Sequence, residues 1–369
     1  MDKILALRGG GELVALWAQL SSVIELVAGV AMTGIGAGLS VLVAQAAPER
    51  RRELLDEALR LGLAIAFPVA AALAAAAWIH PLELAAPAIA LACAVGWLGI
   101  VAGLINSYWL GQEHRGRMLA LAAGSSAVSL AAAAAAPASL LLETLTAAHA
   151  MPVLLLLVVR PSLFAARSTE YRALRRYVLP GLAIGILSPA SLLASRALVA
   201  NALSWHDAGV LQALWRLSDW ICGSAWGVLS VYFLPRLAAA HPKNGVGPVA
   251  RAAFITVGVP AALAFAALFA VHRPLLAALY DPSFTPSSTS VALVLEGSLA
   301  RIASWVPLAA LYAMLRTRSI AVGELLSLPL FAALLALGGA ALSLELAGAL
   351  WLAAFLVYGA FNLWAMRRP

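Results

Sequence analysis

The sequence predicts an all-α polytopic membrane protein with about 11 transmembrane helices in two lobes around a central cavity. Its mean hydropathy is +0.94, with 63% hydrophobic and only 11% charged residues. In soluble globular proteins about a quarter of all residues are charged. Repeated apolar runs of about 20 residues are long enough to cross ~30 Å of hydrocarbon as helices, whereas the alternating segments of an outer-membrane barrel are absent.

Charge clusters, prolines and glycines divide the chain into eleven predicted spans. They cover residues 12–46, 57–79, 83–106, 117–136, 138–160, 174–201, 207–235, 247–271, 287–314, 319–340 and 343–366. The first is too long for one straight span, so we expect either a bend at the glycines of "GIGAG" (34–38) or an interfacial start. A rival count splits residues 11–46 into two helices.

The basic residues predict the orientation of these spans. Of the 24 lysines and arginines, eighteen lie in alternate loops, three lie on the opposite side, and Arg196, Arg216 and Arg301 lie within spans. Because the side rich in basic residues is cytoplasmic in most membrane proteins, the C-terminus is predicted to be cytoplasmic. Eleven spans then place the N-terminus outside, and the rival count places it inside. The basic residues that give the chain its net charge of +7 lie in these loops. Their excess therefore indicates membrane topology, and we predict no nucleic-acid partner.

The longest basic loop predicts the domain organisation. It separates an N-terminal lobe of about five helices (1–160) from a C-terminal lobe of six (177–369), with residues 161–176 as a cytoplasmic linker. Two-lobed transporters commonly arise from repeated halves with the substrate between them. The unequal halves suggest that one N-terminal helix is absent.

The seventh span carries a polar stripe. Gln212, Arg216, Asp219 and Gly223 are spaced i, i+4, i+7 and i+11, which places them on one helix face. With a rise of 1.5 Å per residue from the outer end near Asp207, Arg216 lies roughly 13 Å deep. Ionisable groups at such a depth usually mark a pathway or a site. The alternative is that Arg216 and Asp219 neutralise each other or a neighbouring helix.

Two further arginines extend this prediction. Arg301 lies near the middle of its span, and Arg196 is expected toward the outer interface, where it could instead snorkel to the lipid head groups. If they share a cavity with Arg216, the three form a cationic path for an anionic substrate.

The acids in this half are candidates for ion coupling: Asp219, Glu296 and Glu324. Glu324 lies just over a turn from Arg318 and could pair with it at the interface. Glu296 is rotated by about 140° from Arg301 on an ideal helix, so the two should not pair. A carboxylate here carries a coupling proton or serves as a static counter-ion.

Other polar residues predict no chemistry. Cys93 and Cys222 have no partner spacing for a disulfide or a metal site, and Asn106 and His149 are expected to cap or hydrogen-bond helices. No Walker A motif and no nucleophile-base constellation is present in the sequence, so we predict transport without a cofactor and no enzyme activity.

The block at residues 195–237 resembles the core of the Wzx-type flippases for lipid-linked O-antigen and enterobacterial common antigen units, within the multidrug/oligosaccharidyl-lipid/polysaccharide exporter superfamily. The matching elements are Arg196, "SW", "AG", Gln212, "SD" (218–219) and "SVYFLP" (230–235). Weaker similarity covers residues 34–45 and 297–327. On this register the sequence begins after the family's first helix.

The resemblance implies two lobes that carry an undecaprenyl-pyrophosphate-linked oligosaccharide across a bacterial inner membrane by alternating access. A proton or sodium gradient would drive transport, and a polysaccharide polymerase and assembly proteins would be partners. The family's polar positions map onto Arg196, Gln212, Asp219, Arg301 and Glu324, and Arg216 joins the substrate-binding set on its depth and charge. This chain has Ala37, Val41 and Ser298 where relatives carry Asn, Lys and an acid.

Two alternatives remain open. A small-molecule cation exporter of the MATE type belongs to the same superfamily, but its cavity should be acidic. An inactive or structural membrane component of a polysaccharide assembly complex is favoured by the expected missing helix and the changed polar positions.

Overall fold

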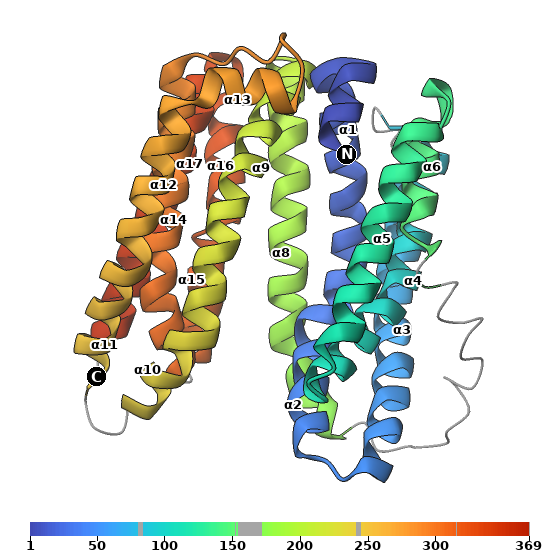
Figure 1. Ribbon diagram of the computed structural model, residues 1–369, viewed down its shortest axis with the longest axis vertical. Coiled ribbons are helices and arrows are strands. Elements are labelled where there is room, and N and C mark those ends of the chain that lie inside the picture. Colours follow the sequence, from blue (N-terminus) through green and yellow to red (C-terminus); the bar gives the residue numbers. More distant parts are fainter. Residues whose placement is uncertain (80–83, 152, 154–171, 241–244, 315, 369) are drawn as a thin grey trace. The chain divides into compact units, whose positions relative to one another are not determined.

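Figure 1 shows a computed structural model of the protein, which describes residues 1–79, 84–151, 153, 172–240, 245–314 and 316–368. These residues form helices joined by short connections, with no strand among them. They form two compact units: unit 1 holds Leu16–Leu193 with Met1, and unit 2 holds Asp2–Ala15 with Ala194–Pro369. The predicted all-α fold is confirmed, whereas most of the predicted linker at 161–176 lies outside the described residues.

Nine helical segments of the described chain are long and apolar enough to cross a membrane. They are Asp2–Gln45, Pro48–Trp78, Ala86–Gly111, Arg115–Ala135, Trp205–Ala240, Val246–Ala270, Ser288–Ala313, Thr317–Ala341 and Leu344–Arg367. Of the other two predicted spans, 138–160 coincides with η2, α6 and residues outside the described ranges, and 174–201 coincides with α8. The protein is therefore a multi-pass membrane protein.

Unit 1 is built around α4, which contacts α2, α3, α5 and α6. Its elements follow one another as α1 (Asp2–Ala31), η1 (Met32–Gly36), α2 (Ala37–Gln45), α3 (Pro48–Ile79), α4 (Ala86–Gly111), α5 (Arg115–Ala135), η2 (Ala138–Leu140), α6 (Leu141–Ala148) and α8 (Arg172–Ala202). Where the sequence suggested a bend near "GIGAG", the chain forms a π-helical turn, η1, and continues into α2 without a loop. A second irregularity lies at Gly9 and Gly10, whose backbone angles are not helical, with φ of +62° at Gly10.

Glycines let the backbones of α8 and of the first helical segment touch. A Cβ atom at Gly185 would lie 2.2 Å from the carbonyl oxygen of Gly29, and one at Gly181 would lie 2.2 Å from the Cα atom of Gly34. Lipid tails are as apolar as leucine side chains, so membrane helices associate by close van der Waals packing of small residues. The spacing of Gly181 and Gly185 provides such a surface on α8.

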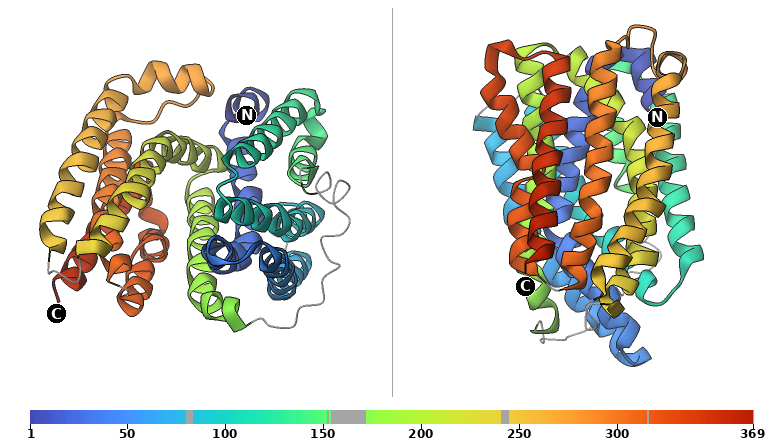
Figure 2. Two further views of the ribbon diagram at one scale, coloured as in Figure 1. Left: turned by 60° about the horizontal axis from the view of Figure 1, so that its bottom comes forward. Right: turned by 90° about the vertical axis from the view of Figure 1, so that its left-hand side faces the viewer.

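Unit 2 contains the first part of α1 (Asp2–Ala15), the end of α8 and every later helix. In order these are α9 (Trp205–Val228), η4 (Leu229–Phe233), α10 (Leu234–Ala240), α11 (Val246–Ala253), η6 (Phe254–Gly258), α12 (Val259–Ala270), α13 (His272–Leu279), α14 (Ser288–Ala313), α15 (Thr317–Leu325), α16 (Leu328–Gly338), η7 (Gly339–Ala341) and α17 (Leu344–Arg367). Helices α14 and α17 pack along their lengths, and α9 packs on α14 (Figure 2).

Serine side chains begin the three helices that form the candidate site. Ser204 accepts a hydrogen bond from the backbone N–H of Asp207 at the start of α9. Ser287 and Ser343 do the same for α14 and α17. A serine in this position satisfies one of the four free N–H groups at a helix start, which stabilises the helix by about 1 kcal/mol.

We expect Gly185→Ala to destabilise the protein, because the added Cβ collides with the backbone of Gly29. Overpacking of this kind costs about 1–3 kcal/mol. The matched control is Gly124→Ala on α5, where an added Cβ meets no atom within 4 Å. That control should be neutral or stabilising, because Ala is the better helix former by ~1 kcal/mol. Size-exclusion chromatography after heating measures the melting temperature of each variant. Equal melting temperatures of the two variants would contradict the close helix contact.

Candidate functional site

The polar stripe of α9 contacts three other segments of unit 2. The Gln212 side chain accepts a hydrogen bond from Arg196 of α8 at 2.8 Å. Arg216 lies 3.8 Å from the carboxylate of Asp2, and Asp219 pairs with Arg301 of α14 at 3.0 Å. Each of Arg216 and Asp219 thus has its ion partner on another helix, as the alternative of neutralisation by a neighbouring helix expected, and the two do not pair with each other.

Arg196 is buried and does not extend outward as a snorkelling side chain would. Its side chain is 2% exposed, and that of Gln212 is 6% exposed. A buried guanidinium is costly unless its N–H groups are hydrogen-bonded, and the Gln212 amide oxygen satisfies one of them. The two residues form a buried polar link between α8 and α9, not an open cationic surface.

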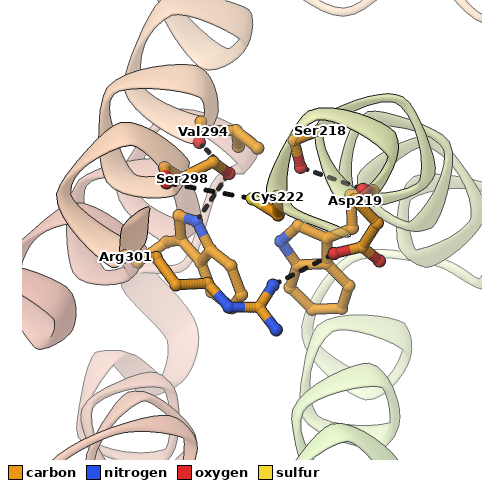
Figure 3. Close-up of polar contacts among 8 residues, drawn as sticks. Ser218, Asp219, Cys222, Val294, Ser298 and Arg301 are labelled. Carbon is orange, nitrogen blue, oxygen red and sulfur yellow. Dashed lines mark hydrogen bonds and ion pairs between the residues drawn. The ribbon is translucent and has the colours of Figure 1, made fainter. Parts of the chain in front are cut away.

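The Asp219–Arg301 ion pair is the centre of the candidate site (Figure 3). Its Nη1–Oδ1 distance is 3.0 Å, and the side chains of Arg301 and Asp219 are 24% and 46% exposed. The Arg301 guanidinium carbon lies 5.0 Å from the ring centroid of Trp305, 5.7 Å from that of Phe355 and 5.9 Å from that of Trp351. Aromatic rings at these distances attract a cation, so they restrict the guanidinium while the carboxylate stays partly open.

Ser298 fixes one of these rings. Its hydroxyl donates to the carbonyl oxygen of Val294 at 2.8 Å and accepts a hydrogen bond from Nε1 of Trp351 at 3.3 Å. The buried free thiol of Cys222 lies 3.9 Å from the Ser298 carbonyl oxygen (Figure 3). At the position where the resemblance implies an acid, this chain therefore has a hydroxyl group that joins α14 to α17.

An aromatic row on α17 links this region to Glu324. Ring centroids of Trp351 and Phe355 lie 4.7 Å apart, and those of Phe355 and Tyr358 lie 6.2 Å apart. The Tyr358 hydroxyl donates to Oε1 of Glu324 at 3.0 Å. The expected pairing of Glu324 with Arg318 is thus replaced by a hydrogen bond to a tyrosine of another helix.

Glu296 lies in different surroundings. It is exposed on α14 and lines a cavity of about 250 Å³ together with Ala262, Phe265 and Phe269 of α12. The Asp219–Arg301 pair agrees with the prediction that Glu296 and Arg301 do not pair along their helix.

An apolar groove of about 440 Å³ begins beside the ion pair. Trp220, the residue after Asp219, lines it together with Ser224 and Val228 of α9 and Pro260 and Ala264 of α12. The charged pair and the groove therefore occupy adjacent faces of α9.

Sequence reasoning missed five partners of the predicted residues: Asp2, Trp305, Trp351, Phe355 and Tyr358. Asp2 lies before the first predicted span, so it was not considered as a membrane acid. For the residues of α17 the sequence did contain a signal. Trp351, Phe355, Tyr358 and Asn362 repeat the i, i+4, i+7, i+11 spacing of the α9 stripe, which places them on one face of that helix.

We expect Arg301→Met and Asp219→Asn to be non-additive in unfolding free energy. Each single change leaves one charge without its partner, while the double variant removes both, so a coupling of about 0.5–1 kcal/mol is expected for this partly exposed pair. Unfolding in mixed micelles with increasing dodecyl sulfate measures it. The control cycle combines Asp219→Asn with Arg251→Met, an exposed residue of α11, and should be additive. Additive effects in both cycles would contradict the pairing.

No family model and no curated protein sequence matches this sequence. Solved structures with similar folds include a MATE family multidrug resistance transporter of the MOP superfamily in an inward-facing conformation, at 13% identity and a TM-score of 0.72 over 98% of this chain and 90% of that chain.

Two others are a MATE protein in complex with MaD5 and a MOP superfamily transporter from Pyrococcus furiosus Vc1 (DSM3638). The first is 13% identical with a TM-score of 0.68, covering 98% of this chain and 89% of that chain. The second is 12% identical with a TM-score of 0.66, covering 99% and 91%. At this identity the likeness concerns the fold alone, and the chain has the fold of the MATE transporters of the MOP superfamily.

Proposed function

We propose that the protein is an alternating-access transporter whose substrate is a lipid-linked oligosaccharide with a pyrophosphate linkage. The cargo would move from the cytoplasmic to the periplasmic leaflet of a bacterial inner membrane. One observation carries this proposal: a membrane helix presents Arg301, held between a half-open carboxylate and three aromatic rings.

Arg301 has the chemistry to bind an anion. A guanidinium carries five N–H donors and binds phosphate oxygens in a bidentate manner, and Asp219 accepts from one of these donors. The surrounding rings reduce the conformational freedom that binding would otherwise remove. Arg216, whose side chain is 39% exposed, is a second candidate contact. The buried Arg196–Gln212 link positions α9, the helix that carries Arg216 and Asp219.

Asp219 offers a route to ion coupling. Its carboxylate competes with an incoming anion for Arg301, so a change in the charge of Asp219 would change the affinity of the guanidinium for the substrate. Glu296 and Glu324 are further candidates for ion coupling, because both lie within membrane helices.

The apolar groove supports an amphipathic cargo. It begins at Trp220, directly after Asp219, and its lining is dominated by apolar side chains. A molecule with a charged head and a long hydrocarbon tail could contact both features at once, whereas a fully water-soluble anion would gain nothing from the groove.

A small-molecule exporter is the second candidate, and the likeness to MATE multidrug transporters favours it. Fold alone does not determine cargo. The Pyrococcus furiosus transporter with this fold is itself described by a binding pocket of reverse polarity that suggests a different function. Transport of a cationic cargo would require Asp219 and would persist after replacement of Arg301. Transport of an anionic cargo would be lost in the Arg301 variant, which separates the two proposals.

We expect Arg301→Ala and Arg216→Ala to abolish surface glycan in a bacterial host that lacks its own O-antigen flippase. Both variants should reach the membrane in normal amounts, as measured by immunoblot. Arg251→Ala, exposed on α11, is the matched control and should support glycan at the level of the unmodified protein. Wild-type glycan in both site variants would overturn the anionic cargo.

We also propose that the C-terminus lies in the cytoplasm, where a polysaccharide polymerase and assembly proteins could be partners of the transporter. The uneven distribution of lysine and arginine between alternate loops supports this orientation. A C-terminal green fluorescent protein should fluoresce, and a C-terminal alkaline phosphatase should be inactive. The reverse pattern would contradict the orientation.

A further inference from the structure

We infer that one end of unit 2 binds the head group of an anionic phospholipid of the bilayer. This surface, called the arginine end below, is formed by Arg236 of α10, Arg316 and Arg318 at the start of α15, and Arg367 and Arg368 at the end of α17. The inference goes beyond the proposed function, because it concerns a lipid that surrounds the protein and holds for either class of cargo.

The arginine end gathers around the last turn of α14. Helices α10, α15 and α17 each pack on α14, and Figure 1 shows α10 and the C-terminal end of α17 at the same end of unit 2. Arg316 joins two of these helices, because its Nη1 donates to the carbonyl oxygen of Ala365 at 2.9 Å. Ala313 ends α14 and lies about 18 Å along this helix from Arg301, at 1.5 Å per residue. The arginine end is therefore separate from the candidate site.

The positive charge of the arginine end is not compensated by acids. None of its five arginines has an ion pair among the described residues, and the surrounding segments 229–260, 309–323 and 352–369 contain no Asp or Glu in the sequence. In unit 1, by contrast, Arg50 at the start of α3 pairs with Glu53 and Glu57. Acids contribute little to membrane orientation, so orientation alone does not account for their absence here.

Two of the arginines are held on exposed aromatic rings. The guanidinium carbon of Arg236 lies 3.6 Å from the ring centroid of Tyr232, and that of Arg368 lies 3.5 Å from the ring centroid of Trp364. Tyr232 is 47% exposed and Trp364 is 49% exposed. Because a ring contacts the face of a guanidinium, the N–H donors at its edge stay available for phosphate oxygens. The rings also reduce the conformational freedom that lipid binding would otherwise remove.

The position of these two stacks favours a lipid as the source of the phosphate. The apolar spans Trp205–Ala240 and Leu344–Arg367 end close to Arg236 and Arg368, and Trp and Tyr side chains at such ends lie at the level of the lipid head groups. Phospholipid phosphates are concentrated at this level, and the 79% exposed side chain of Val231 offers a contact to an acyl chain. A zwitterionic lipid would bring an ammonium group toward the arginines, so charge complementarity favours an anionic one.

Native mass spectrometry of the protein in detergent micelles tests this inference. The probes are dioleoylphosphatidylglycerol, which is anionic, and dioleoylphosphatidylcholine, which is zwitterionic, and a titration with each gives its affinity. We expect the anionic lipid to bind roughly fivefold more tightly or better, since the interaction of one basic residue with an anionic lipid surface corresponds to about this factor. Equal affinities for the two lipids would overturn the inference.

A double variant, Arg236→Gln with Arg368→Gln, locates the bound lipid. It should bind dioleoylphosphatidylglycerol roughly fivefold more weakly or worse than the unmodified protein. The matched control is Arg52→Gln with Arg115→Gln, which also removes two exposed arginines, from unit 1, and should change the affinity by less than about twofold. Equal losses in the two double variants would mean that net charge alone attracts the lipid, which overturns the inference.

Two further arms test the charge and the source of the phosphate. Arg236→Lys with Arg368→Lys keeps both charges and should keep the preference for the anionic lipid, so loss of that preference would contradict charge complementarity. Size-exclusion chromatography checks that each variant is folded. Glycerol 1-phosphate, at the concentration of the lipid, should displace no dioleoylphosphatidylglycerol. Displacement would mean that the arginine end binds a free phosphate, which overturns the assignment to a lipid.

Discussion

The ion pair between Asp219 and Arg301 is the constraint on which the arrangement of unit 2 depends. Two charges within membrane helices must be paired, because each is costly in hydrocarbon alone. The pair at 3.0 Å therefore fixes α9 against α14, and the rings of Trp305, Trp351 and Phe355 close around the guanidinium. Ion pairs that are partly exposed contribute little to stability, so stability alone does not explain these charges. The 46% exposure of the Asp219 side chain leaves part of its carboxylate accessible.

Both units contain close glycine contacts, and unit 2 adds a cluster of aromatic rings. In unit 2 a Cβ atom at Gly209 of α9 would lie 1.9 Å from the carbonyl oxygen of Gly11. In unit 1 the backbones touch at Gly29 and Gly185, where any side chain would separate them. In unit 2 the central helices are separated by large rings, with Trp215, Phe331 and Trp351 in mutual contact at centroid distances of 5.1–5.9 Å. Small residues bring backbones together without leaving polar groups, whereas rings leave indole and phenol groups that need partners. Ser298 and Glu324 are those partners for Trp351 and Tyr358.

Hydropathy and loop charge predicted the membrane helices because a spanning helix satisfies its own backbone hydrogen bonds, so its signal is local in the sequence. The α9 stripe was predictable for the same reason, since spacing alone defines a helix face. Its partners were not, because pairing between helices depends on packing. Arg196 bonds to Gln212 instead of snorkelling to the lipid head groups, and Glu324 bonds to Tyr358 across 34 residues of chain. The equal spacing of polar and aromatic residues on α17 would have identified that helix as part of the site.

The chemistry of the site in unit 2 bears on the two proposed cargoes. It offers a guanidinium, a carboxylate and an apolar groove lined by the residue that follows this carboxylate. Under the proposed function, the anionic linkage of the cargo would contact the guanidinium and its hydrocarbon tail would contact the groove. A small cation would use the carboxylate alone, so the guanidinium and the groove are the features that separate the two proposals.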